Sequence, residues 1–290
     1  AEDTCGVRRI IKDLAAAVFT GEPIVPYLGI VHDRVALEVM RGCTRGCRFC
    51  QAGYIYRPIR ERKSETLMKL ARQQIGCTGY DEVSLLSLST GDYSEVHKLV
   101  PEIIREMEAG KVSVSLPSLR VDSELASDLK VMQTVRKGGL TFAPEAGTQR
   151  LRDVINKNVT EEDILRATQD AFSAGWSSVK LYFMIGLPTE TDEDILGIAQ
   201  LARKVSWQFY QLPKELRGKG LRLNVSVSTF VPKPFTAFQW CGQISPDEIR
   251  RKQELLRNAP TGVRGTELNS NYSLFSFLED PSPAGATRGH

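Results

Sequence analysis

The sequence has few of the features that mark membrane, secreted or disordered proteins. It lacks any run of about 18 or more apolar residues, as a transmembrane helix would require, and its N-terminus has no apolar signal stretch. Charged residues make up 25% and hydrophobic residues 41% of the 290-residue chain, which excludes a disordered or collagenous protein. We therefore expect a cytoplasmic globular protein without membrane contact. The chain begins at Ala1 instead of Met, so we expect a fragment of a longer protein.

Several ligand-binding motifs are also absent. The sequence has no Walker loop, and no Gly-x-Gly-x-x-Gly follows a predicted strand. It also has no Asp-x-His-x-x-Gly, the motif that supplies a lower ligand to cobalamin. Any cobalamin would therefore need an upstream domain that this sequence does not contain.

Cysteine is not abundant, but its placement is informative. Three of the six cysteines, Cys43, Cys47 and Cys50, fall within eight residues, whereas the others are scattered. A tight cluster in a chain without a secretion signal indicates metal binding in a reducing compartment. Arg45 and Arg48 favour the thiolate forms, and Gly46 allows a tight turn. Three thiolates in one loop fit an iron–sulfur cluster with one iron left open to a small molecule.

Two other interpretations of the cysteines stay open at this point. They are three packed or incidental side chains, or they bind structural zinc. Structural zinc normally takes four protein ligands, and the fourth would have to come from Cys77, Cys241 or His32, none of which has the usual spacing.

Apolar strand-like runs alternate with helical patterns along most of the chain. We expect strands at residues 35–40, 83–88, 112–116, 140–143, 179–185 and 221–231, and helices at residues 66–75, 94–108, 123–135, 160–173, 191–205 and 245–257. Six strand–helix units predict an α/β fold with parallel strands, either a doubly wound sheet or an incomplete barrel. In both folds, ligands bind at the carboxyl ends of the strands.

Helix caps and flanking segments complete the outline. Ser94, Thr160 and Ser245 are the expected N-caps of their helices. We also expect a helix over residues 7–19, an edge strand over 24–31 and a further strand over 272–278. Residues 1–33 form an approach segment, residues 34–258 the core, and residues 259–290 a partly disordered tail.

The cysteine run resembles that of the radical S-adenosylmethionine (SAM) superfamily, over roughly residues 35–257. Residues 38–62 and 181–193 are similar to an uncharacterised bacterial subfamily whose members usually carry an upstream cobalamin-binding-like domain. The resemblance implies a partial (βα)6 TIM-type barrel and a 4Fe–4S cluster held by Cys43, Cys47 and Cys50. It also implies S-adenosyl-L-methionine on the fourth iron. One electron would then cleave the cofactor to methionine and a 5′-deoxyadenosyl radical that modifies a substrate.

The resemblance also implies which other residues contact the cofactor. Thr90, Gly91 and Asp92 occupy the place of the family's Gly-Gly-Glu motif, which binds the methionine ammonium group. Glu145 stands where related enzymes have a carboxylate near the ribose hydroxyls. Ile185 and Gly186 belong to a motif that backs the adenine, and Phe49 would lie against the same ring. Each of these residues also has a simpler interpretation, which stays open here. Thr90, Gly91 and Asp92 can form an ordinary turn, and Glu145 can be a solvated acid on a loop. The adenine motif can be a strand followed by a capped helix.

A basic block surrounds the cysteines. Residues 41–63 contain seven basic residues and one acidic residue, although the whole chain carries only +3. Basic side chains mixed with Tyr54 and Tyr56 suit an RNA or nucleotide substrate. The alternative is a solvated loop that offsets the charge of a cluster, and +3 overall does not resemble a dedicated nucleic-acid-binding protein.

Three functions follow from these observations. The first is a radical SAM enzyme that takes electrons from a reductant such as flavodoxin or ferredoxin. The second is a cobalamin-dependent radical methyltransferase that needs a missing upstream domain. The third is a non-enzymatic zinc or cluster module that binds RNA.

Overall fold

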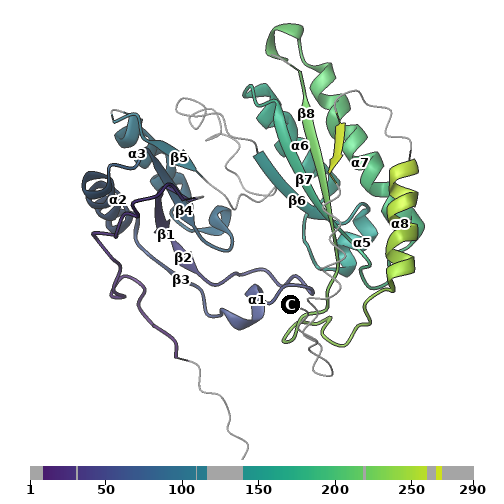
Figure 1. The fold of residues 1–290 in the computed structure, drawn as a ribbon, viewed down its shortest axis with the longest axis horizontal. Coiled ribbons are helices and arrows are strands. Elements are labelled where there is room, and N and C mark those ends of the chain that lie inside the picture. Colours follow the sequence, from purple (N-terminus) through teal and green to yellow (C-terminus); the bar gives the residue numbers. More distant parts are fainter. Residues whose placement is uncertain are drawn as a thin grey trace, which may run out of the picture.

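The computed structural model describes residues 9–30, 32–108, 110–115, 140–217, 220–259 and 266–269. Strands and helices alternate through these residues, and the longer strands form two parallel sheets (Figure 1). The first sheet has the order β1-β4-β5, formed by Val35–Glu38, Glu82–Leu86 and Ser113–Ser115. The second has the order β6-β7-β8-β9, formed by Leu140–Glu145, Ser178–Ile185, Arg222–Thr229 and Thr266–Asn269. Two parallel sheets with helical connections agree with the predicted partial barrel.

Helices cover the sheets and connect their strands. In the first half these are α2 and α3, which span Ser64–Thr78 and Val96–Glu108. In the second half they are α5, α6, α7 and α8, which span Gln149–Val154, Glu161–Ser173, Asp192–Gln211 and Pro246–Asn258. Shorter elements are β2, α1, β3 and the 3-10 helices η1 and η3, at Met40–Arg41, Ala52–Ile55, Arg60–Glu61, Thr90–Asp92 and Lys214–Leu216.

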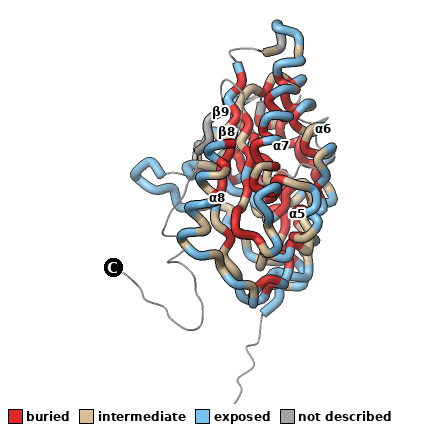
Figure 2. Tube along the Cα trace, turned by 90° about the vertical axis from the view of Figure 1, so that its right-hand side faces the viewer, coloured by how far each residue is buried: buried red, intermediate tan, exposed pale blue. Residues whose placement is uncertain are grey.

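The core forms because alternate residues of each strand face the helices. In β7, Val179, Leu181 and Phe183 are almost completely buried, and they share one apolar cluster with Ile198 and Val205 of α7. Lys180 and Tyr182 lie between these positions and are more exposed, so they belong to the other face of the sheet. Figure 2 shows buried positions concentrated in the strands and in the helix faces turned toward them.

Helix boundaries follow local signals in the sequence. Thr160 and Asp163 form a capping box at the start of α6, and the Ser245 hydroxyl accepts the backbone N–H of Glu248 at the start of α8, so both predicted caps are confirmed. The predicted cap at Ser94 is wrong. Its hydroxyl and backbone N–H both donate to the Glu61 carboxylate, and α3 begins two residues later.

The N-terminal predictions are also wrong for the residues that the structure describes. Residues 9–30 contain neither a helix nor a strand. Leu14 is buried, but Val18 and Ile24 are almost fully exposed, so the apolar pattern has no continuous surface to pack against. The predicted helix at 123–135 and strand at 272–278 lie outside the described residues. Strand β9, which pairs with β8, falls in the segment predicted as a tail.

Candidate functional site

The three clustered cysteines lie on one loop that follows β2. Cys43 and Cys47 are 9% and 8% exposed, whereas Cys50 is partly buried. The backbone N–H of Cys50 donates to the carbonyl of Cys47 over 3.1 Å, which closes a tight turn. None of the five cysteines in the described residues forms a disulfide. The loop therefore presents three thiols from a segment of eight residues.

Two glycines allow this loop to pack against its neighbours. Gly42 has φ +97°, and a Cβ at this position would lie 2.7 Å from the carbonyl oxygen of Tyr56. A Cβ on Gly53 of α1 would lie 2.1 Å from the carbonyl oxygen of Arg45. Both contacts are with backbone atoms, which cannot move aside, so a side chain at either glycine would displace the cysteine loop.

The thiols fit an iron–sulfur cluster better than a single metal ion. Within the described parts of the chain, no three His, Cys, Asp or Glu side chains gather closely enough to hold one ion. Sulfur ligands of one tetrahedral zinc lie only about 3.8 Å apart, because each zinc–sulfur bond is about 2.3 Å long. In a 4Fe–4S cluster each thiolate binds a different iron, so the cysteine sulfur atoms lie further apart than around one zinc ion. Three thiol ligands on one loop, with no fourth cysteine beside them among the described residues, suit such a cluster.

Residues 154–157, which are the last residue of α5 and the three that follow it, hold the cysteine loop from the second half of the chain. The backbone N–H of Arg48 donates to the carbonyl of Ile155 over 2.9 Å, and its guanidinium donates to the carbonyl of Val154. The Asn156 side-chain amide donates to the carbonyl of Gly46 over 2.8 Å. We call residues 154–157 the strap. It fixes the stretch of loop between the first and last cysteines.

The strap also joins two residues predicted from the family resemblance. Lys157 Nζ lies 3.1 Å from Glu145 Oε1 and 6.0 Å from the centroid of the Phe49 ring. The side chains of Lys157 and Glu145 are only 11% and 17% exposed. Glu145 has φ +69° and follows an irregularity in the β6–β7 register, and such backbone strain concentrates at functional sites. Phe49 and Glu145 therefore meet at one place, through a lysine that the sequence analysis missed.

The predicted ammonium-binding residues form the short helix η1. Asp92 accepts two hydrogen bonds from the guanidinium of Arg45, one of them 2.9 Å long, and one from the Ser89 hydroxyl over 2.7 Å. Thr90 is completely buried, and its hydroxyl contacts that of Ser87. This arrangement ties the carboxyl end of β4 to the cysteine loop.

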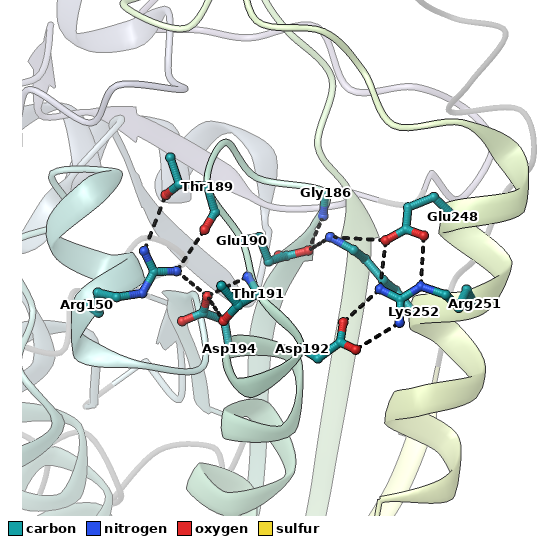
Figure 3. A network of polar contacts seen from close by, with 10 residues as sticks. All are labelled: Arg150, Gly186, Thr189, Glu190, Thr191, Asp192, Asp194, Glu248, Arg251 and Lys252. Atoms are coloured by element: carbon teal, nitrogen blue, oxygen red, sulfur yellow. Dashed lines mark hydrogen bonds and ion pairs between the residues drawn. The ribbon is translucent and has the colours of Figure 1, made fainter.

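The end of β7, formed by Ile185 and followed by Gly186, rests on a buried ion pair (Figure 3). The Glu190 carboxylate accepts the backbone N–H of Gly186 over 2.8 Å and an N–H of Lys252 over 2.6 Å. The side chains of Glu190 and Lys252 are 1% and 6% exposed. Burial raises the pKa of the Glu190 carboxyl, and the hydrogen bonds from Lys252 and Gly186 offset only part of this effect. Helix α8 therefore supports the loop that follows β7.

A second network joins the turn after β6 to the start of α7 (Figure 3). The Asp194 carboxylate accepts hydrogen bonds from the side chains of Thr148 and Arg150 and from the backbone N–H of Thr191. Burial raises the pKa of this carboxyl, but the combined hydrogen bonds lower it below its ordinary value. A Cβ on Gly147 would lie 2.3 Å from the backbone oxygen of Asp194, so the two turns are in close contact.

The side chain of Arg152, on α5, stabilises the turn that follows Glu145. It is completely buried and donates to the carbonyls of Ala146, Gly147 and Val159 over 3.0, 3.3 and 3.1 Å. Burial lowers the pKa of its guanidinium. Because these carbonyls flank both Glu145 and the strap, Arg152 fixes the spacing between them.

The predicted residues thus fall into three groups that the structure arranges differently. Phe49 and Glu145 meet through Lys157, and Asp92 meets the cysteine loop through Arg45. Ile185 and Gly186 are held separately by Glu190. Asn156, Lys157, Arg152 and Lys252 were missed, because nothing in a single sequence distinguishes them from surface residues. Cys241 packs beside a small apolar cluster that includes Phe230 and Phe238, as expected for a structural thiol.

Sequence comparisons identify relatives of this chain. A family model described as the radical SAM superfamily matches residues 37–202. The chain is 42% identical to an uncharacterised protein of Methanocaldococcus jannaschii, over 70% of this chain and 42% of that protein. It is 27% identical to a tRNA-2-methylthio-N(6)-dimethylallyladenosine synthase of Carboxydothermus hydrogenoformans, over 60% of this chain and 41% of the synthase. The chain thus spans about two fifths of the length of these relatives.

Solved structures share the fold at low sequence identity. A radical S-adenosylmethionine methyltransferase from Kitasatospora setae, with cobalamin and a [4Fe–4S] cluster bound, matches with a TM-score of 0.53 and 13% identity, over 71% of this chain and 36% of that one. SuiB from Streptococcus suis matches with a TM-score of 0.55 and 11% identity, over 85% of this chain and 50% of that one. No helix in the described residues is long and apolar enough to cross a membrane.

Proposed function

This chain belongs to the radical SAM superfamily, and we propose that it is the catalytic core of an enzyme that cleaves S-adenosylmethionine reductively. The observation that carries the proposal is the set of three cysteines on one partly buried loop, which also carries Phe49 and which the strap joins to Glu145. A purely structural metal site would not need a strained carboxylate and an aromatic ring beside it.

Cys43, Cys47 and Cys50 would hold a 4Fe–4S cluster through their thiolates. When bound, this cluster would supply the electron for reductive cleavage of S-adenosylmethionine, the chemistry that starts hydrogen abstraction from a substrate. The protein holds the cysteine loop rigid through the strap and through Arg45, and it keeps the loop away from water by burying two of the three thiols.

The remaining predicted residues would bind the cofactor. Glu145 accepts hydrogen bonds from ribose hydroxyls, and Phe49 contacts the adenine. The Ile185 side chain is fully buried in the core, so this residue contributes only its backbone. The backbone of Thr90 and Gly91, together with Asp92, accepts from the ammonium group, and Gly186 brings its backbone close to the adenine. Lys157 pairs with Glu145 and so fixes the orientation of that carboxylate. A small reductant, such as flavodoxin or ferredoxin in the cytoplasm, supplies the electron.

A cobalamin-dependent radical methyltransferase is the second candidate. It is favoured by the similarity in fold to the methyltransferase from Kitasatospora setae, whose structure contains cobalamin. Cobalamin bound by the full-length protein, measured by its absorbance after purification, would select this candidate over a radical enzyme without cobalamin.

Metal analysis of anaerobically reconstituted protein tests the proposal. We expect about four irons and four sulfides per chain and a broad absorbance near ~400 nm. Replacing any one of Cys43, Cys47 and Cys50 by Ala should remove the absorbance, whereas Cys77→Ala should keep it. Zinc without iron, or a triple variant that keeps the absorbance, would contradict the proposal.

A further inference from the structure

A pocket of about 340 Å³ opens at the carboxyl ends of β1 and β4. It is lined by eight residues, Glu38, Met40, Arg41, Gly42, Tyr56, Leu86, Ser87 and Leu88. Gly42 directly precedes Cys43, and Leu88 lies two residues before Thr90. The pocket therefore borders the proposed cofactor site, but none of the residues assigned to the cofactor lines it. Its position beside the cysteine loop suits a substrate.

The walls of the pocket carry large hydrophobic side chains that are about half exposed to solvent. Leu86, Leu88 and Tyr56 are 51%, 48% and 50% exposed. The main chain at Tyr56 is held in place, because Arg60 donates to its carbonyl over 3.2 Å and Gly42 allows close approach of the same oxygen. A half-exposed tyrosine and two half-exposed leucines that line one pocket offer a surface on which a flat ring can stack.

Charged side chains provide hydrogen-bonding groups at the edge of the same pocket. Arg41 donates two hydrogen bonds to the Glu38 carboxylate, over 2.6 and 3.0 Å, and the two side chains are 39% and 21% exposed. Buried Arg62 lies 3.6 Å from the other side of that carboxylate, so two positive charges face one negative charge. A guanidinium and a carboxylate side by side can donate to and accept from the edge of one heteroaromatic ring.

The pocket lies within the basic block that stands out in the sequence. Three of its lining residues, Arg41, Gly42 and Tyr56, belong to this block of residues 41–63, and Arg57, Arg60 and Lys63 follow within seven residues of Tyr56. Arg57 and Lys63 are exposed, and the Arg57 guanidinium donates to the carbonyl of Thr44 on the cysteine loop. Excess positive charge beside a stacking surface favours a ligand that combines a flat ring with phosphates.

We propose that this pocket binds an unpaired nucleobase of a single-stranded nucleic acid, whose phosphates contact the basic block. The proposal rests on the proposed function, because it assigns the substrate class of that enzyme. The base stacks on Tyr56 and the leucines, and its edge meets Arg41 and Glu38. RNA and DNA offer the same base and phosphate chemistry at this pocket.

Binding of labelled oligonucleotides to the reconstituted protein tests the pocket. Fluorescence anisotropy would compare single-stranded RNA and DNA heptanucleotides of one sequence with an acidic peptide of equal net charge, in the presence of saturating S-adenosylmethionine. We expect at least one oligonucleotide to bind, and Tyr56→Ala to raise its Kd by roughly ten-fold through lost stacking. Tyr210→Ala, which removes an exposed tyrosine on α7, is the matched control and should leave the Kd unchanged. Arg57→Ala should lower the salt dependence of binding.

Four outcomes would overturn the pocket assignment. They are no binding of either oligonucleotide, an unchanged Kd in the Tyr56→Ala protein, equally tight binding of the acidic peptide, and displacement of the oligonucleotide when S-adenosylmethionine is titrated into a complex formed without it. The absorbance near ~400 nm, recorded on the same samples, shows whether the cluster is present. It therefore distinguishes a wrong pocket assignment from a wrong proposed function. A loaded cluster without oligonucleotide binding rejects only the pocket, whereas a missing cluster rejects the enzyme. Thermal melting of each variant shows whether the half-exposed substitutions leave the fold intact.

Discussion

Lys157 Nζ lies 3.1 Å from Glu145 Oε1, and this contact joins the strap to the turn after β6. Both side chains are mostly buried, so each charge relies on the other for compensation. We expect Lys157→Met to lower the free energy of unfolding by about 1–3 kcal/mol and to weaken binding of S-adenosylmethionine by roughly ten-fold. Urea unfolding and equilibrium dialysis measure the two effects. Lys98→Met, at an exposed ion pair on α3, is the control and should change neither quantity appreciably.

Asn156 is expected to stabilise the cysteine loop through its bond to the Gly46 carbonyl. Its φ of +53° suits asparagine and glycine, so Asn156→Gly removes the donor without straining the backbone. We expect this variant to lose its cluster several-fold faster in air, measured by the decay of absorbance near ~400 nm. Asn158→Gly is a close control, because Asn158 is exposed and has φ +52°. Equal decay rates in the two variants would rule out this role for Asn156.

Asp194 should make the stability of the protein depend on acid pH. Its pKa is lowered in the folded state, so its contribution is complete above the unfolded value of about 3.9 and is lost as pH falls from there through the folded pKa. Asp194→Asn should therefore lower the free energy of unfolding by about 1–3 kcal/mol at pH 7 and by less near pH 3. Chemical unfolding at both pH values measures this. Asp247→Asn, on an exposed turn of α8, should cost under about 1 kcal/mol at pH 7. A cost for Asp194→Asn that stays constant with pH would contradict the prediction.

Lys252 is expected to stabilise the fold because it compensates the buried negative charge of Glu190. Lys252→Met leaves the Glu190 carboxylate buried without its cation and should lower the free energy of unfolding by about 3–5 kcal/mol. The double variant Glu190→Gln/Lys252→Met should recover part of this loss, because no buried charge is then left unpaired. Thermal or urea unfolding of the two proteins tests this directly. Lys204→Met, at a half-exposed pair with Glu161, should cost under about 1 kcal/mol.

The alternation of strands and helices could be predicted from the sequence, because hydrophobic periodicity and helix caps such as Thr160 are local signals. The sequence was also sufficient for the cysteine loop, whose ligands come from one short segment. It failed at residues 9–30, where apolar periodicity exists but Leu14 alone is buried and Phe19 packs only partly against the core. Lys157 and Lys252 could not be predicted either, because their roles depend on partners 12 and 62 residues away that only the fold brings near.

The central claim is that the cysteine loop carries a cluster that cleaves S-adenosylmethionine. Anaerobic reconstitution, reduction with dithionite and chromatographic detection of 5′-deoxyadenosine test it most directly. We predict that the reconstituted protein forms 5′-deoxyadenosine, that Cys43→Ala, Cys47→Ala and Cys50→Ala each abolish it, and that Cys77→Ala retains it. No 5′-deoxyadenosine from protein with a fully loaded cluster, or its undiminished formation by the three cysteine variants, would contradict the claim.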